Sequence, residues 1–305
     1  MKFSLKFICI IFLFSINLLV YGQIKVHYYS KSVFAENIET LKKTTLVFVV
    51  TDNYKDSLDV IEKALEKSWT LTKYEVITYD ELKYYVNEDG YSYMKMQGFL
   101  ATPKILSTVY FELQLKVENS DKTKITWKPI AYMNLYIDRT NNTEGIEKGE
   151  EYLYEIQYHN YNAGFLKLFV KTINDYILAG KPIGEFDTDI SIPSEVEKLK
   201  MDTLYIPDYT LKLSKKYVSE SKFKVRSHEE FLEDYPYEAT ILSADELGNK
   251  ILNGSIDYAL IYTSDSELIS FMVYNVKTGE LIYGKFLEFK ENLKSKDLLD
   301  IFEEN

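Results

Sequence analysis

The first half of the chain alternates buried-strand and helix patterns. Residues 45–50 (TLVFVV) form an unbroken apolar run with β-branched side chains, which predicts a buried strand followed by a polar turn. Leu58, Ile61, Leu65 and Trp69 then recur every three or four residues, which predicts an amphipathic helix. Similar patterns predict a short helix over 80–86 and strands over 74–78, 91–96, 108–117 and 124–137, the last two joined by a turn at 119–122.

The second half repeats this order. Residues 203–206 (TLYI) parallel residues 45–48, and a helix is predicted to end each half, at about 163–179 and 295–302. Between them the patterns predict helices over 228–234 and 245–252 and strands over 237–242, 256–262, 270–276 and 280–286. This order fits either a duplication or a chance recurrence of one of the few allowed topologies.

The predicted fold class is α/β to α+β, with two tandem, possibly duplicated, modules that each carry a mixed sheet with helices packed on it. Strand, helix, strand series imply parallel crossovers, whereas the hairpins that follow add antiparallel strands. Residues 181–199 contain Pro, Gly and clustered polar residues, which are typical of a linker. We therefore expect a first module over 23–180, a linker over 181–199 and a second module over 200–305.

The first 22 residues have the pattern of a secretory signal peptide. Lys2 and Lys6 precede an apolar run over 7–20, and Gly22 marks a cleavage site before Gln23. The run is too short and too interrupted for a membrane span, so we expect a secreted or periplasmic protein with no transmembrane segment after signal removal. The single cysteine, Cys9, lies in this segment, so the mature chain would have no disulfide and no thiolate chemistry.

The charge of the chain argues against nucleic acid as a partner. The formal net charge is −11 at pH 7, with 36 basic and 47 acidic residues. Phosphate binding requires a concentrated basic face, and Arg139 and Arg226 are the only arginines available for a bidentate clamp.

Known catalytic and metal-binding motifs are missing. His228 begins a segment that resembles the zinc-protease helix, but Leu232 stands where the second histidine would be required. His27 and His159 are isolated, and no Gly-rich phosphate loop or nucleophile elbow follows a predicted strand. The sequence therefore predicts no metal, no cofactor and no catalytic residue, which favours a non-enzymatic protein without deciding the question.

The repeated Asp-Glu-Leu segments at 80–82 and 245–247 have a structural explanation. Thr78 stands three residues before Glu81, and Ser243 three residues before Glu246, which is the spacing of a helix capping box. We therefore interpret these carboxylates as helix caps rather than as catalytic groups.

Topology gives the first candidate ligand site. Ligands of open sheets bind beyond the carboxyl ends of parallel strands, which nominates Asp52, Asn53 and Tyr54 in the first half and Asp208 and Tyr209 in the second. The alternative is that these residues form ordinary turns and caps.

Tyrosine supplies the second candidate, since the chain has 27 of them. Alternation over 151–158 predicts a strand that places Tyr152, Tyr154 and Tyr158 on one face, where they could stack on sugar rings or on an apolar partner. The alternative is a sheet face buried beneath a helix that carries Phe165 and Phe169.

Several segments resemble uncharacterised secreted proteins of Bacteroidetes: the VYGQ junction at 20–23, TLYIPD at 203–208 and KTGELIY at 277–283. That resemblance implies no activity. Residues 46–77 are also similar to the α/β module of curli-secretion-type periplasmic lipoproteins, which implies a fold only, because the lipidated cysteine of the mature lipoproteins is missing here.

These observations predict a non-catalytic binding or assembly protein of the bacterial cell envelope, with an envelope protein or a glycan as its partner. The alternative is a glycan-active hydrolase whose carboxylates converge only in the folded chain.

Overall fold

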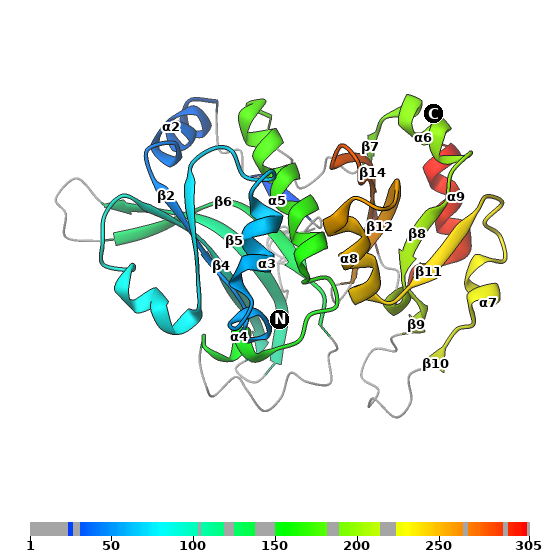
Figure 1. Cartoon of the computed structure of the whole chain (residues 1–305), viewed down its shortest axis with the longest axis horizontal. Helices are drawn as coiled ribbons and strands as arrows, with labels where there is room; N and C mark the ends of the chain where they lie inside the picture. The colour runs from blue at the N-terminus through cyan, green and yellow to red at the C-terminus, as the bar shows by residue number, and fades with distance from the viewer. Residues whose placement is uncertain are drawn as a thin grey trace, which may run out of the picture.

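The computed structural model describes residues 24–26, 31–102, 105–118, 125–137, 150–181, 189–213, 224–264, 268–288 and 292–303. The predicted signal peptide, with Cys9 and the cleavage site, lies outside these residues, as does the turn at 119–122. The described chain forms two six-stranded mixed sheets with helices packed on them (Figure 1). No helix in this part of the chain combines the length and the apolar character that crossing a bilayer requires.

The first sheet has three parallel strands at one side and antiparallel strands at the other. Its order is β1 (Ile24–Val26), β6 (Ile125–Leu135), β5 (Ile105–Glu118), β4 (Tyr91–Thr102), β2 (Thr45–Val49) and β3 (Lys73–Ile77). Strand β2 is parallel to β3 and to β4, and the remaining pairs are antiparallel. The connecting elements are α2 (Lys31–Leu41), η1 (Asp52–Tyr54), α3 (Leu58–Leu65), η2 (Tyr79–Tyr84), α4 (Tyr152–Glu155) and α5 (Ala163–Leu178).

The second sheet has the same plan. Its order is β11 (Ala239–Leu242), β8 (Leu204–Pro207), β12 (Tyr258–Ser264), β13 (Leu268–Asn275), β14 (Glu280–Glu288) and β7 (Asp189–Ser191). Strand β8 is parallel to β11 and to β12, and the other pairs are antiparallel. The other elements are α6 (Pro193–Leu199), η5 (Asp208–Leu211), the ribbon β9 (Lys212–Leu213) and β10 (Lys224–Val225), α7 (His228–Leu232), α8 (Ala244–Asn253) and α9 (Ser295–Glu303).

The two modules correspond element by element. In both, a short strand precedes a helix and pairs antiparallel with the last strand of its sheet, as β1 does with β6 and β7 with β14. Strands β2 to β6 then match β8 and β11 to β14 in order and direction, with α3 matching α7, η2 matching α8 and α5 matching α9. The predicted fold class is confirmed, and the repeat extends further than the sequence pattern indicated.

Residues 189–199 belong to the second sheet, although we expected them to be part of a linker. They carry β7, which pairs with β14, and α6, whose Val196 and Leu199 are fully buried. Pro193 occupies the first position of α6, where a proline costs no hydrogen bond. The proline that suggested a linker therefore begins a helix.

Helix α5 holds the two modules together. It lies between α3 of the first module and α8 of the second (Figure 1). It buries consecutive residues, including Phe165 with Leu166 and Leu168 with Phe169, so it is covered on more than one side. A Cβ atom on Gly164 would lie 2.0 Å from the carbonyl oxygen of Gly248 in α8, so only glycine permits this approach.

Side-chain hydrogen bonds connect α5 to α8. Asn162 caps α5 by accepting from the Phe165 amide, and its side-chain NH₂ donates to the Ala244 carbonyl of α8. At the other end of α8, Lys167 Nζ donates to the Ile251 carbonyl at 3.1 Å, where a cation also suits the helix dipole.

The predicted strand over 151–158 is wrong. Residues 152–155 form the short helix α4, and residues 156–158 continue without strand structure. Strand β6, the last strand before this segment, already has β5 on one side and β1 on the other, so no free edge of β6 remains to pair with it. The predicted helix caps are present. Thr78 and Glu81 form a complete capping box, and the Ser243 hydroxyl accepts a hydrogen bond from the Glu246 amide.

Candidate functional site

A cavity of about 450 Å³ lies on one face of the first sheet, between η2 and strands β4 and β6. We call this the η2 face, and the matching side of the second sheet the α8 face. Three aromatic residues line the cavity, namely Tyr79, Tyr93 and Trp127. Its volume falls within the roughly 300–1,000 Å³ of small-molecule sites.

The floor of the cavity is aromatic and rigid. The rings of Tyr93 and Trp127 meet edge to face at 5.0 Å and 84°. Tyr93 is fully buried and donates its hydroxyl to the Tyr85 carbonyl at 2.7 Å, which ties β4 to the residue after η2. Burial raises the pKa of Tyr93 to about 12, so it is an uncharged phenol at neutral pH.

A stacked pair forms another wall. Tyr79 of η2 stacks on Tyr154 of α4, with centroids 4.4 Å apart. Tyr154 is 1% exposed and accepts the Met96 amide at 3.0 Å, so it supports Tyr79 from behind. Burial and then Glu150 raise the pKa of Tyr79, which places that carboxylate near the phenol.

The rest of the lining consists of two apolar side chains, Leu82 and Val86, and four charged ones, Asp80, Lys83, Lys95 and Glu150. Lys95 Nζ pairs with Glu150 Oε1 at 2.8 Å and lies 5.8 Å from the centre of the Trp127 ring. Asp80 and Lys83 are exposed at the rim.

A half-buried carboxylate lies beside Lys95. Glu112 is its cross-strand neighbour on β5, and burial raises the pKa of Glu112 while Lys95 opposes that rise. The Gln114 side chain donates a hydrogen bond to Glu112. Lys95 is therefore held between one carboxylate in the sheet and another at the cavity.

This arrangement suits binding. Flat aromatic groups with fixed planes adjoin donors and acceptors that are already positioned, as in sites that orient a small ligand. The described residues contain no group of three His, Cys, Asp or Glu side chains that could hold a metal.

Two of the five residues predicted from topology, Tyr54 and Asp208, bond to helix N-termini. Asp208 is exposed and accepts the Ala244 amide at the start of α8, at 3.2 Å. Tyr54 is half-buried and accepts the Ala163 amide at the start of α5, at 3.1 Å, while burial raises its pKa. Each loop therefore bonds to the start of one of the two helices that pack together between the modules.

The other topological candidates differ in exposure. Asp52 and Asn53 are exposed on η1. Tyr209 is 2% exposed, and its hydroxyl donates to the Tyr262 carbonyl at 3.0 Å.

The tyrosines over 152–158 do not form an exposed surface. Tyr152 is half-buried, and Tyr154 and Tyr158 are buried. The Tyr158 hydroxyl donates to the Leu153 carbonyl at 2.7 Å. Of the three, Tyr154 contributes to the cavity, through its stacking on Tyr79.

Sequence analysis missed Trp127, Lys95, Tyr79 and Asp80 as site residues. One signal was present, because Lys95 interrupts a run of buried residues in β4. A lysine at such a position indicates a sheet face that is not closed by an apolar helix.

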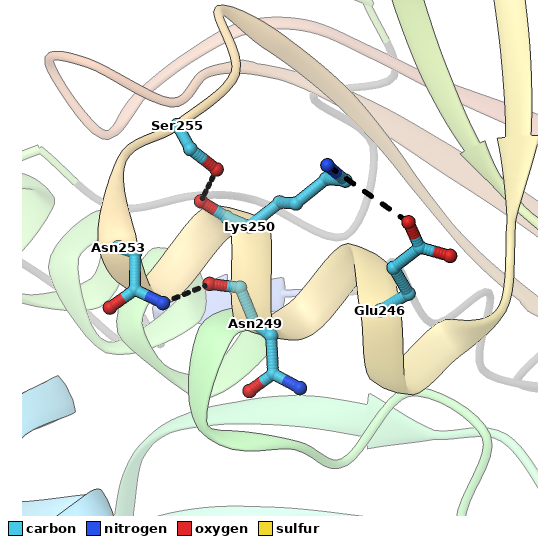
Figure 2. Close-up of a pocket in the computed structure, with 5 residues that line it drawn as sticks. All are labelled: Glu246, Asn249, Lys250, Asn253 and Ser255. Carbon is cyan, nitrogen blue, oxygen red and sulfur yellow. Dashed lines mark hydrogen bonds and ion pairs between the residues drawn. The ribbon is translucent and has the colours of Figure 1, made fainter.

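A second hollow of about 400 Å³ lies beside α8 and has a different character. It is lined by Glu246, Asn249, Lys250, Asn253 and Ser255, and Figure 2 shows them bonded within their own segment. Lys250 lies 3.9 Å from Glu246, and Asn253 donates to the Asn249 carbonyl at 3.0 Å. Asn253 also accepts a hydrogen bond from Lys63 of α3 at 3.0 Å, and no aromatic ring lines the hollow, so we interpret it as polar helix surface beside the first module.

Comparison with known proteins adds no relative: no protein family, no curated protein and no solved structure matches the chain. The functional argument therefore depends on the geometry of the cavity and on the contrast between the two modules.

Proposed function

We propose that this chain is a non-catalytic binding protein of the cell envelope, secreted or periplasmic, whose ligand occupies the cavity on the η2 face. One observation carries the proposal. At equivalent positions of the two sheets, the first module has aromatic and charged residues beside the cavity. The second module has apolar residues there, and helices cover them.

The pairing register gives the equivalent positions. Leu46 of β2 pairs with Ser92, and its counterpart Leu204 of β8 pairs with Tyr258. Ser92 of β4 is therefore equivalent to Tyr258 of β12. One and three residues further along these strands, Tyr93 is equivalent to Ala259 and Lys95 to Ile261. The cross-strand partners follow, so Glu112 on β5 matches Met272 on β13.

In the second module this face is buried against α5 and α8. Ala259, Ile261 and Met272 are each at most 1% exposed. Tyr274, on the same face, has its hydroxyl beside the Thr172 side chain of α5. An apolar face has to be covered to be stable in water, and α5 provides that cover.

In the first module the same positions carry polar atoms that can remain in contact with water. Lys95 pairs with Glu150 and borders the cavity, which Tyr79, Trp127 and the apolar Leu82 and Val86 also line. A concave surface with positioned polar groups is the general form of a ligand site. Its aromatic residues supply apolar area that a ligand can bury.

Trp127 provides the test. The chain has two tryptophans, and the other, Trp69, is 3% exposed in the core. In a Trp69→Phe background, Trp127 alone reports on the cavity. We expect immobilised protein to retain one fraction of the envelope extract of its source organism, with a change in Trp127 fluorescence. Trp127→Ala should abolish retention, whereas Tyr84→Ala, which alters an aromatic residue that is 68% exposed and absent from the lining, should not.

Retention that is unchanged in Trp127→Ala would refute a ligand site in this cavity. Failure to retain any envelope fraction would refute the binding function itself.

A glycan-active hydrolase is the second candidate, favoured by two carboxylates, Asp80 and Glu150, in one cavity. Such enzymes need one protonated carboxyl as a general acid, usually in an apolar pocket. Here Glu150 is bonded to Lys95, and Asp80 is exposed. Release of reducing ends from the retained fraction, lost in both Asp80→Asn and Glu150→Gln, would establish the enzyme instead.

A further inference from the structure

We propose that the ligand of this cavity is an uncharged saccharide, with a sugar ring against Trp127 and its hydroxyl groups bonded to the charged lining. This inference rests on the proposed function, since it names the chemistry of the ligand for the same site. It follows from the charge balance, the aromatic geometry and the position of the cavity on the sheet.

The charges that line the cavity cancel. Asp80 and Glu150 are opposed by Lys83 and Lys95, and Lys95 is bonded to Glu150 at 2.8 Å. An ionic ligand that bonds to Lys95 or Glu150 would compete with this pair. A neutral ligand leaves the pair intact.

The pair nevertheless offers hydrogen bonds. A lysine ammonium has three N–H donors, and a carboxylate can accept several bonds. Lys95 uses one donor on Glu150, whose side chain is 41% exposed. A hydroxyl group both donates and accepts, so it can bond to a neighbouring ammonium and carboxylate together. Saccharides carry such hydroxyls in adjacent pairs.

The aromatic residues match the other surface of a sugar. One face of a pyranose ring presents C–H groups, which pack on an aromatic ring, while the hydroxyls project from its edge. The contact with Tyr93 fixes the plane of Trp127, and Tyr154 fixes the plane of Tyr79. Because these rings are already held, little side-chain entropy is lost on binding.

A peptide fits this position less well. Extended peptides commonly bind by adding a strand at a free sheet edge, where backbone groups are unpaired. Tyr93 and Lys95 lie on β4, which has β2 on one side and β5 on the other. The cavity therefore lies on the face of the sheet, where side chains and not backbone groups make the contacts.

The test compares probes that differ in charge and in chemistry. Residues 23–305 in the Trp69→Phe background are titrated with neutral oligosaccharides of gluco, manno and galacto configuration, with oligogalacturonate, with oligoglucosamine and with an uncharged peptide. Trp127 fluorescence and calorimetry report binding. We expect at least one neutral oligosaccharide to bind, and Trp127→Ala to weaken it at least about tenfold, or about 1.4 kcal/mol. Tyr84→Ala should leave the affinity unchanged.

Each other outcome decides the question. Binding only of a charged probe or of the peptide, lost in Trp127→Ala, would overturn the saccharide while the binding function stands. If no probe binds, sugar analysis of the envelope fraction retained through Trp127 decides: sugar supports the inference, and its absence overturns it. If nothing is retained, the binding function fails as well. Circular dichroism of each variant shows whether a loss reflects misfolding.

Discussion

The η2 face and the α8 face are the same surface of two modules with one topology, and they have opposite chemistry. The α8 face carries Ala259, Ile261 and Met272 and is covered by α5. At two of the equivalent positions the η2 face carries Lys95 and Glu112, beside a cavity. Topology therefore does not decide what a surface does. The residues placed on it decide whether it becomes an interface between modules or a site.

The equivalent helices α5 and α9 also differ in how many of their sides are buried. Helix α5 is buried on several sides because it serves both sheets. Helix α9 buries Leu298 and Ile301 but exposes Lys296 and Glu303. Helix α9 therefore has one buried side and one polar side, as expected for a helix that packs on a single sheet.

Exchanging residues between the two faces is the strongest test of this comparison. Ile261→Lys places a charge beneath helices without a partner, and we expect a loss of about 3–5 kcal/mol of stability or failure to fold. The reciprocal Lys95→Ile should cost only about 1 kcal/mol, because Glu150 is 41% exposed to water and Glu112 keeps its hydrogen bond from Gln114. Denaturant unfolding of both variants measures the difference. Equal losses would mean that the two faces are not chemically distinct.

The contact between α5 and α8 supplies the next largest effect. Gly164→Ala drives a methyl group into the Gly248 backbone, and we expect it to destabilise the chain by about 2–3 kcal/mol. Gly284→Ala is the matched control, since its Cβ would meet Ile190 and Met272 at ordinary distances of 3.8 Å. Thermal unfolding compares the two. A Gly164→Ala protein as stable as the control would rule out close packing of these helices.

Removing the Tyr154 hydroxyl group behind the cavity should lower the stability by a smaller amount. Tyr154→Phe keeps the stacking on Tyr79 but leaves the buried Met96 amide without its acceptor, which costs about 1–3 kcal/mol. Tyr84→Phe, at an exposed position on the same module, should change nothing. Denaturant unfolding measures both, and an unchanged Tyr154→Phe would show that Tyr154 does not support the cavity wall.

We expect alkaline pH to lower the stability of both modules slightly and to a similar extent. The Glu75 hydrogen bond raises the pKa of Tyr85 to about 12, and burial raises that of Tyr258 to about 12. These phenols keep their protons in the folded chain after the unfolded chain loses them near pH 10. Stability is therefore constant below pH 10 and falls between 10 and 12.

Phenolate absorbance and unfolding as functions of pH check this expectation. Glu75→Gln should lower the pKa of Tyr85 toward 10 and leave Tyr258 unchanged. Tyrosines that all titrate near pH 10 in the folded chain would contradict the structure.

Local pattern was sufficient for the elements that bury one stripe or one run of residues. The apolar run at 45–49 is a strand and the spacing of Leu58, Ile61 and Leu65 is a helix. Thr78 forms a complete capping box, and Ser243 caps α8. It failed at 152–158, where alternating tyrosines suggested a strand. Alternation shows that a strand is possible, but a strand also requires a free neighbour, and β1 had already taken that place.

The sequence by itself determined most of the long strands and helices and their order, because strand and helix periodicities are properties of neighbouring residues. Only the tertiary structure decided which sheet face α5 covers and which remains beside a cavity. Trp127, Lys95, Tyr79 and Glu150 are far apart in the chain, and the strand register and the η2 crossover bring them together. Their proximity depends on pairing between strands that are distant in the sequence, and local sequence patterns do not encode that pairing.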